Sequence, residues 1–226
     1  MATLGTPGVS SQTVNSNNHD IVLPASYSPG DMLLMVIACD GQQSPALSAF
    51  WSILDTDQNG VLHRHLIAWG VADGTEDDDL VWETGATEQS TTVVYPVIGA
   101  DTSTPPELAG AASQGTDAAP DPPAVSPSWG AEADTLFVIA ITNDSNITVS
   151  AFPTNYTDNG ANHGDSSTGG ARAGVSWRNA NTATEDPGAG TLSAAEEWIA
   201  NTIAIRTAVV APEGPFAMLR PAVMVP

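Results

Sequence analysis

The sequence has no lysine and only five Lys or Arg residues in total, against 26 acidic residues, which gives a formal net charge of −21. The five arginines are scattered singly along the chain: Arg64, Arg172, Arg178, Arg206 and Arg220. Proteins that bind nucleic acid need clustered Lys or Arg to neutralise phosphates and release counterions. We therefore expect no direct nucleic-acid partner, and the same charge disfavours an anionic membrane surface.

Cysteine and long hydrophobic runs are also scarce. The single cysteine, Cys39, lies in the apolar run Met32–Cys39, where a thiol is expected to be buried and inert, and no intramolecular disulfide is possible. This run is far shorter than the roughly 20 residues of a membrane-spanning helix. Residues 1–5 show neither the basic nor the apolar region of a secretory signal. We expect a product that is soluble in the cytoplasm where it is made.

What the chain does contain favours β-structure. It has 20 Gly, 17 Pro and only 14% charged residues, a composition typical of short strands joined by many turns. Two runs, Met32–Cys39 and Leu136–Ile141, are apolar on both faces, as expected of central strands that are covered on both sides. The predicted fold is all-β, a two-sheet antiparallel β-sandwich of jelly-roll-like type with about eight to ten strands and extended N- and C-terminal segments.

Changes in composition along the chain predict its organisation. Residues 1–18 are polar and predict an N-terminal arm or an edge segment, and residues 19–206 predict the sandwich domain. Within the sandwich, residues 100–133 form a Pro-rich stretch without periodicity, which predicts an excursion over the surface. Residues 207–226 are apolar but interrupted by proline, so they predict an arm that binds in a groove of its own chain or of a neighbour.

Several strands are expected between the two central runs. Ile21–Ala25 predicts a first strand, and the turn signal Asn59-Gly60 predicts a hairpin between Phe50–Leu54 and Val61–Ala72. Two further strands are expected at residues 80–83 and 91–98.

Two patterns in that hairpin are typical of metal ligands. The motif Asp55-x-Asp57-x-Asn59-Gly60 matches the first half of a calcium loop, but the twelfth position is Leu66 instead of a bidentate Glu. His63 and His65 are two apart in a strand, so both rings project from one face, yet no third ligand is identifiable nearby. We expect a plain acidic turn, histidines facing solvent or an interface, and no metal.

Catalytic patterns are weak. Gly164-Asp165-Ser166 lies in a Gly- and Ser-rich loop and lacks the flanking glycines of a nucleophile elbow. The acidic runs at residues 76–79 and 196–197 offer paired carboxylates, but exposed acidic runs are common in so acidic a chain. We therefore expect no catalytic residues, no cofactor and no enzymatic activity, with an acid–base hydrolase as the least favoured hypothesis.

Aromatic and apolar residues outside the strand patterns are the candidates for interaction. Most of the six tryptophans lie in apolar strand patterns and predict core positions, whereas Trp129 lies in the Pro-rich excursion. Trp129 and Tyr156 are therefore candidate contact residues. The C-terminal segment adds five more: Phe216, Met218, Leu219, Val223 and Met224.

Strand and turn patterns between Pro29 and Arg206 resemble a family of β-sandwich proteins encoded among the structural genes of tailed bacteriophages. The segments that carry the resemblance are Gly30-Asp31-Met32-Leu33-Leu34, Trp69-Gly70-Val71-Ala72-Asp73-Gly74-Thr75-Glu76, Pro122-Pro123, Asp134-Thr135-Leu136, Phe152-Pro153-Thr154-Asn155-Tyr156 and Trp198-Ile199-Ala200-Asn201-Thr202-Ile203-Ala204-Ile205. The resemblance implies a virion component, on the head or on the tail.

Two functional hypotheses follow. The first is a non-enzymatic capsid decoration or cement protein on the outer surface of the virion, which stabilises the shell through contacts with the major capsid protein or other virion proteins and forms a homo-oligomer. The alternative is a tail-associated carbohydrate- or receptor-binding module. Neither hypothesis requires nucleic acid or membrane as a partner.

Overall fold

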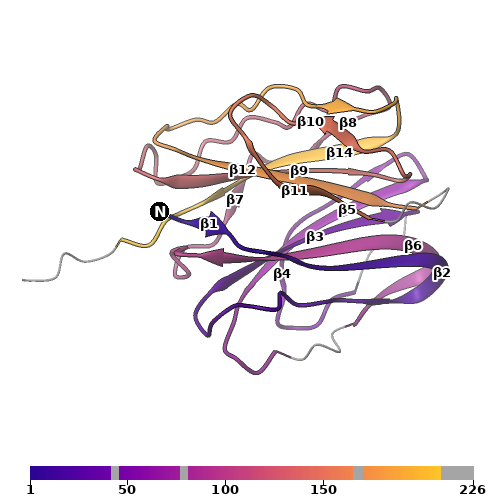
Figure 1. Cartoon of the computed structure of the whole chain (residues 1–226), viewed down its shortest axis with the longest axis horizontal. Coiled ribbons are helices and arrows are strands. Elements are labelled where there is room, and N and C mark those ends of the chain that lie inside the picture. The colour runs from indigo at the N-terminus through magenta and orange to yellow at the C-terminus, as the bar shows by residue number, and fades with distance from the viewer. Residues whose placement is uncertain (42–45, 77–80, 165–169, 210–226) are drawn as a thin grey trace, which may run out of the picture.

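A computed structural model describes residues 1–41, 46–76, 81–164 and 170–209. Two antiparallel sheets face each other in two layers, and both ends of the described chain lie at the same end of the molecule (Figure 1). The predicted two-sheet antiparallel β-sandwich is confirmed. The described residues form 14 strands, more than predicted, because five of them are only two or three residues long. Within these residues no helix occurs that is long and apolar enough to cross a membrane.

The first sheet runs in the order β1-β6-β3-β5-β4, and β2 also pairs with β6. Its strands are β1 (Thr3–Leu4), β2 (Gly8–Asp20), β3 (Met32–Asp40), β4 (Ser52–Asn59), β5 (His63–Val71) and β6 (Val81–Ile98). Residues 3–4 and 8–20 of the N-terminal segment thus belong to the sheet. Residues 81–83 and 91–98 of the two expected strands are parts of the single long strand β6, and residue 80 lies outside the described residues. The register of the β2–β6 pair shifts between Gln12 and Ser16 and again between Ser16 and Asn18.

The second sheet runs in the order β11-β12-β9-β14-β7, and β8 also pairs with β14. Its strands are β7 (Glu107–Leu108), β8 (Ser113–Gly115), β9 (Thr135–Asn143), β11 (Thr157–Gly164), β12 (Arg172–Ala180) and β14 (Trp198–Ile205). A short pair, β10 (Val149–Ala151) and β13 (Thr191–Leu192), forms a separate two-stranded sheet whose Val149 and Leu192 pack in one apolar cluster with Ile141 and Trp198 of the second sheet.

The core lies between the sheets and continues on their outer faces. Alternate residues of β3, such as Met32 and Leu34, pack against Leu136 and Val138 of β9. The intervening β3 residues join a second apolar cluster on the outer face of the first sheet, which includes Leu33, Met35, Ile21, Leu23 and Trp51. Met32–Cys39 and Leu136–Ile141 are therefore interior strands buried on both faces, as predicted.

Two local predictions were wrong. Ile21–Ala25 is not a strand; Ile21 and Leu23 instead pack on the outer face of the first sheet, and the proline in this segment has no N–H to donate to a ladder. Asp55–Asn59 is not a turn but part of β4, and the chain reverses at residues 60–62, where Gly60 adopts a φ of 59°.

Candidate functional site

Strand β4, the last strand of the first sheet, is held to the second sheet by alternate polar side chains. Oδ2 of Asp55 accepts a hydrogen bond of 2.8 Å from Nδ2 of Asn201 on β14. Oδ2 of Asp57 accepts one of 3.0 Å from the backbone N–H of Ala112, next to β8. Because successive side chains of a strand alternate in direction, residues two apart reach the same neighbour.

Asn59 completes this row. Its Nδ2 donates to the carbonyl oxygens of Gly115 at 2.7 Å and Trp198 at 3.2 Å. We call Asp55, Asp57 and Asn59 the polar row. Polar and charged side chains that point inward from an edge strand also disfavour the addition of a strand from another chain at that edge. The acidic motif that resembles half a calcium loop thus joins the two sheets.

Two histidines of β5 lie behind this row and are fully buried. Nε2 of His63 lies 2.8 Å from Oγ1 of Thr142, and Nδ1 of His65 lies 3.1 Å from the same oxygen. Nδ1 of His63 lies 3.2 Å from the carbonyl oxygen of Cys39. The prediction that His63 and His65 face solvent or an interface was wrong: both side chains lie between the two sheets of this chain and contact Thr142 of the second sheet.

The single hydroxyl proton of Thr142 has two acceptors in reach, Nε2 of His63 at 2.8 Å and the carbonyl oxygen of Ile199 at 3.4 Å, and the shorter contact favours the histidine. A carbonyl oxygen only accepts, so Nδ1 of His63 donates to Cys39, and Nε2 of a neutral His63 accepts from the hydroxyl of Thr142. The same hydroxyl oxygen then accepts from Nδ1–H of His65. Nε2 of His65 is left without a proton or a hydrogen-bond partner, 3.7 Å from Oδ2 of Asp55.

Burial keeps both rings neutral. Desolvation lowers the pKa of His63 to about 4. The pKa of His65 falls to about 3, through desolvation and, to a smaller degree, through its neighbour His63. Desolvation, followed by the charge of Asp57, raises the pKa of Asp55 above its usual value. His63, His65 and Thr142 therefore form an uncharged polar contact between the sheets at neutral pH.

A third histidine shares this behaviour. His19 is buried on β2, with Nδ1 2.7 Å from Oγ of Ser90 and Nε2 3.2 Å from Oγ1 of Thr84. Desolvation lowers its pKa to about 4. Burial also raises the pKa of the Cys39 thiol well above its usual value, so this residue lacks the thiolate character of a nucleophile. Within the described ranges, no group of three or more His, Cys, Asp or Glu residues is arranged to hold a metal ion.

Carboxylates from both sheets meet at the end of the sandwich opposite the termini. Asp144 follows β9, Asp40 ends β3, and Glu196 and Glu197 directly precede β14. Desolvation, followed by the charges of Glu196, Glu197 and Asp40, raises the pKa of Asp144 to about 7. From the sequence, Glu196-Glu197 was interpreted only as an exposed acidic run. Its proximity to Asp144 and Asp40 depends on the fold and could not be predicted.

The two aromatic contact candidates lie together on the outer face of the second sheet. Trp129 and Tyr156 are both partly buried against an apolar cluster that includes Phe137. The hydroxyl of Tyr156 donates to Oε1 of Glu185 at 2.9 Å, and the guanidinium of Arg178 lies 5.5 Å from the centre of the Tyr156 ring. Nothing in the sequence indicated that these two candidates share a cluster, since 26 intervening positions include two strands.

Glu185 is itself a buried charge. Its side chain is 2% exposed and forms an ion pair of 2.5 Å with Arg178. The backbone of Glu185 also pairs in both directions with that of Val125, in the Pro-rich excursion. This arrangement fastens the excursion across the outer face of the second sheet.

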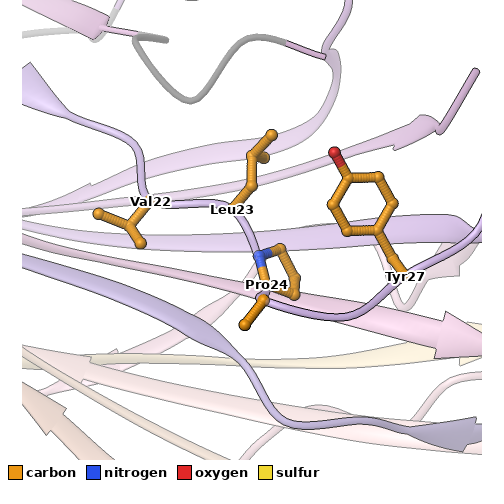
Figure 2. Close-up of a pocket in the computed structure, with 5 residues that line it drawn as sticks. Val22, Leu23, Pro24 and Tyr27 are labelled. Carbon is orange, nitrogen blue, oxygen red and sulfur yellow. The ribbon is translucent and has the colours of Figure 1, made fainter. Parts of the chain in front are cut away.

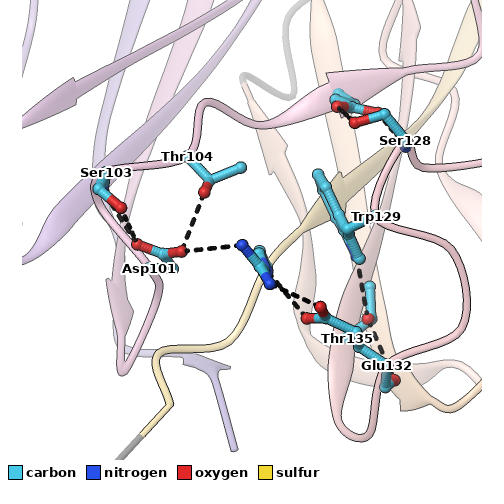
Figure 3. A network of polar contacts seen from close by, with 9 residues as sticks. Asp101, Ser103, Thr104, Ser128, Trp129, Glu132 and Thr135 are labelled. Carbon is cyan, nitrogen blue, oxygen red and sulfur yellow. Dashed lines mark hydrogen bonds and ion pairs between the residues drawn. The ribbon is translucent and has the colours of Figure 1, made fainter.

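A polar network fastens both ends of the same excursion to Arg206, which directly follows β14 (Figure 3). Arg206 donates from Nε and Nη2 to the two carboxylate oxygens of Glu132, at 2.8 and 2.6 Å, and its Nη1 lies 3.7 Å from Oδ2 of Asp101. Trp129 donates from Nε1 to Oγ1 of Thr135 at 3.4 Å. The indole N–H of Trp129 is thus directed into the fold.

The two ends of the described chain meet beside this network. The backbone N–H of Ala2 donates to Oγ1 of Thr207 at 3.2 Å, and that hydroxyl donates to the carbonyl oxygen of Asp134 at 2.5 Å. The backbone N–H of Ala208 donates to the carbonyl oxygen of Gly99 at 2.9 Å. The next residue, Val209, is 82% exposed. The other five sequence-predicted contact residues lie outside the described residues: Phe216, Met218, Leu219, Val223 and Met224.

An apolar pocket lies on the outer face of the first sheet (Figure 2). Its volume is about 320 Å³, and its described lining is Val22, Leu23, Pro24, Ala25 and Tyr27. The pattern of residues 21–25 predicts a strand and therefore gives no sign of this pocket.

Comparison of the chain with protein-family models, with curated proteins and with solved structures finds no match. The resemblance of its strand and turn motifs to phage structural proteins therefore stays a prediction.

Proposed function

We propose that the chain is a non-enzymatic virion protein, a capsid decoration protein that stabilises the shell through contacts with the major capsid protein or with other virion subunits. The observation that carries this proposal is the place on the sandwich at which the C-terminal segment begins. Thr207 and Ala208 are fixed to the sandwich by backbone and side-chain hydrogen bonds, and the apolar segment starts directly after them with the exposed Val209. A rigid body with an apolar segment at one end suits attachment to a neighbour.

The chemistry of the sandwich interior supports the same proposal. Polar side chains in this interior join the two sheets: His63 and His65 contact Thr142, Asp55 accepts from the side chain of Asn201, and Asp57 and Asn59 bond to backbone groups near β8 and β14. The net charge of −21 favours solubility and opposes non-specific association. Attachment through an apolar segment needs no charge complementarity with the shell.

Electron microscopy of the phage particle tests this function. With the full chain, the proposal predicts one density per decorated site over the whole head, and a chain without residues 210–226 is expected to stay folded but to be missing from the particles. Replacement of the exposed Val14 by Ser, distant in sequence from the C-terminal segment, is the control and should leave attachment unchanged. Density only at the tail tip would contradict a decoration role.

The second candidate is a carbohydrate- or receptor-binding module of the tail, and the shared cluster of Trp129 and Tyr156 favours it. Partly exposed aromatic rings packed against one apolar cluster suit stacking against a sugar face. Titration of the full chain with host surface glycans, followed by tryptophan fluorescence, tests this function. Saturable binding that is lost in Trp129→Ala would support the tail module, and an unchanged signal would count against it.

A further inference from the structure

The pocket on the outer face of the first sheet is open and uncharged. Val22, one of its lining residues, is 44% exposed, whereas Leu23 is anchored in the apolar cluster of that face, against which Tyr27 also packs. None of the five lining residues carries a charge. A charged group would lose its hydration here without gaining a partner from these side chains, so the pocket suits an apolar occupant.

The chain contains such an occupant in residues 210–226. This segment has only two charged residues, Glu213 and Arg220, whose charges cancel, and its proline content favours extended conformations. Extended proline-containing segments commonly bind in apolar grooves that contain an aromatic residue. In this pocket the aromatic residue is Tyr27. The apolar side chains of the segment are Val210, Phe216, Met218, Leu219, Val223, Met224 and Val225.

The segment starts close enough to reach the pocket. Thr207 is hydrogen-bonded to Ala2, and the chain from Ala2 to Gly8 spans at most about 22 Å at about 3.3–3.6 Å per residue. Gly8 lies directly against the backbone of Val22 and Leu23. At the same length per residue, residues 210–226 extend to about 55–60 Å. This length exceeds the distance of at most about 22 Å between Ala2, next to the start of the segment, and Gly8, next to the pocket.

Both the reach of the segment and the charge of the protein favour binding of the pocket to the segment of the same chain over binding to that of a second copy. A tethered segment has an effective concentration in the millimolar range, far above the concentration of other copies in a dilute solution. Two copies, each with a net charge of −21, also repel each other unless salt screens them.

We propose that, in the free subunit, the pocket formed by Val22, Leu23, Pro24, Ala25 and Tyr27 binds the C-terminal segment 210–226 of the same chain. The pocket then covers apolar side chains that would otherwise face water, and a neighbouring subunit competes with it for the segment. The inference concerns the isolated subunit and stands or falls separately from the virion function.

Cysteine cross-linking in the full chain tests the proposal. Ala25, at the pocket, is exposed, and Ala217 lies between two apolar residues of the segment, whereas the native Cys39 is fully buried. Under mild oxidation, Ala25→Cys/Ala217→Cys is expected to form a disulfide within one chain, seen as a monomer on a non-reducing gel and confirmed by peptide mapping. The control Val14→Cys/Ala217→Cys should form at least tenfold less of the disulfide within one chain, because Val14 is exposed but lies outside the pocket.

A disulfide-linked dimer would show that the occupant belongs to a second copy, and cross-linking no greater than in the control would show that the pocket does not hold the segment; either result overturns the proposal. Hydrogen exchange of the full chain gives an independent measurement. Amides of residues 213–225 should exchange at least tenfold more slowly than in a synthetic 207–226 peptide. Val22→Asp should abolish this difference and Val14→Asp should preserve it; equal rates in the unsubstituted chain and the peptide overturn the proposal.

Discussion

Nε2 of His63 lies 2.8 Å from the hydroxyl oxygen of Thr142, so two fully buried polar side chains join the first sheet to the second inside an otherwise apolar interface. The same hydroxyl also contacts His65. Replacing Thr142 with Val keeps the shape but leaves both imidazoles without this partner. Each unsatisfied buried group costs about 1–3 kcal/mol, so we expect a loss of about 2–4 kcal/mol in the free energy of unfolding.

Urea unfolding at pH 7.5 measures this loss. Thr116→Val is the matched control, because Thr116 is exposed, and it should change the free energy of unfolding by less than about 0.5 kcal/mol. A Thr142→Val chain as stable as the control would mean that the imidazoles find other partners.

The buried histidines predict acid sensitivity. His19, His63 and His65 have pKa values lowered to about 4, 4 and 3, whereas an unfolded histidine titrates near 6.5. The unfolded chain therefore binds more protons than the folded chain below pH 6.5. The histidine contribution to stability is complete above that pH and falls by up to about 1.4 kcal/mol per pH unit for each histidine as the pH drops toward 4.

Urea unfolding between pH 4.5 and 8 checks this prediction. His63→Gln is expected to reduce the acid slope by about one proton, whatever its effect on stability at pH 7.5. A slope that does not differ between the two chains would contradict a neutral, buried His63.

Asp144 predicts the opposite pH dependence of stability from that of the buried histidines. Its pKa rises from 3.8 to about 7 in the folded chain, so the folded chain binds the extra proton between these values. Stability from this group is present below pH 3.8 and is lost as the pH rises through 7. Asp144→Asn removes this loss, and we expect it to stabilise the fold by about 1–2 kcal/mol at pH 8, a figure reduced to allow for screening by solvent.

Thermal unfolding at pH 8 and pH 4 separates stabilisation by removal of the Asp144 charge from stabilisation that does not depend on pH. Asp144→Asn should raise the melting temperature at pH 8 and change it little at pH 4. Asp121→Asn, at an exposed position, should do neither. Equal shifts at both pH values would show that the gain has a cause other than the carboxylate charge.

The composition of the chain and its two short apolar runs were enough to predict the sandwich and its two central strands. Met32–Cys39 and Leu136–Ile141 lack polar residues on either face, and only an interior strand suits such a pattern. Asp55-x-Asp57-x-Asn59 and His63-x-His65 also have the period of two that is typical of strands. In the first motif, the turn signal of Asn59-Gly60 led to the wrong prediction, because residues next to a turn can still pair in a strand.

Contacts between distant segments could not be predicted in this way. Thr142 is one polar residue at the end of an apolar run, and its partners His63 and His65 lie about 80 positions earlier. The shared cluster of Trp129 and Tyr156 likewise depends on how the Pro-rich excursion crosses the second sheet. Such contacts are set by sheet order and register, which a single sequence does not encode in any local pattern.

The buried ion pair between Arg178 and Glu185 predicts a large effect from removing one partner. Glu185 is almost completely buried, so Arg178→Met leaves its charge uncompensated. We expect a loss of about 3 kcal/mol in the free energy of unfolding, since breaking a buried pair costs about 3–5 kcal/mol and Arg178 is partly exposed. Urea unfolding at pH 7.5 measures it, and the double variant Arg178→Met/Glu185→Gln should recover at least half; a double variant no more stable than the single one would contradict the ion-pair explanation.

The polar row predicts a weak response to calcium. A calcium loop needs carboxylate oxygens that converge on one ion. Here Asp55 and Asp57 accept hydrogen bonds from Asn201 and from the backbone of Ala112, which fixes them along a strand. Millimolar calcium should therefore shift the melting temperature of the full chain by less than about 1 °C, because only preferential binding to the folded state stabilises it. Magnesium at the same concentration controls for screening of the acidic surface, and a stabilisation specific to calcium that is lost in Asp57→Ala would mean that these side chains leave their partners to bind the ion.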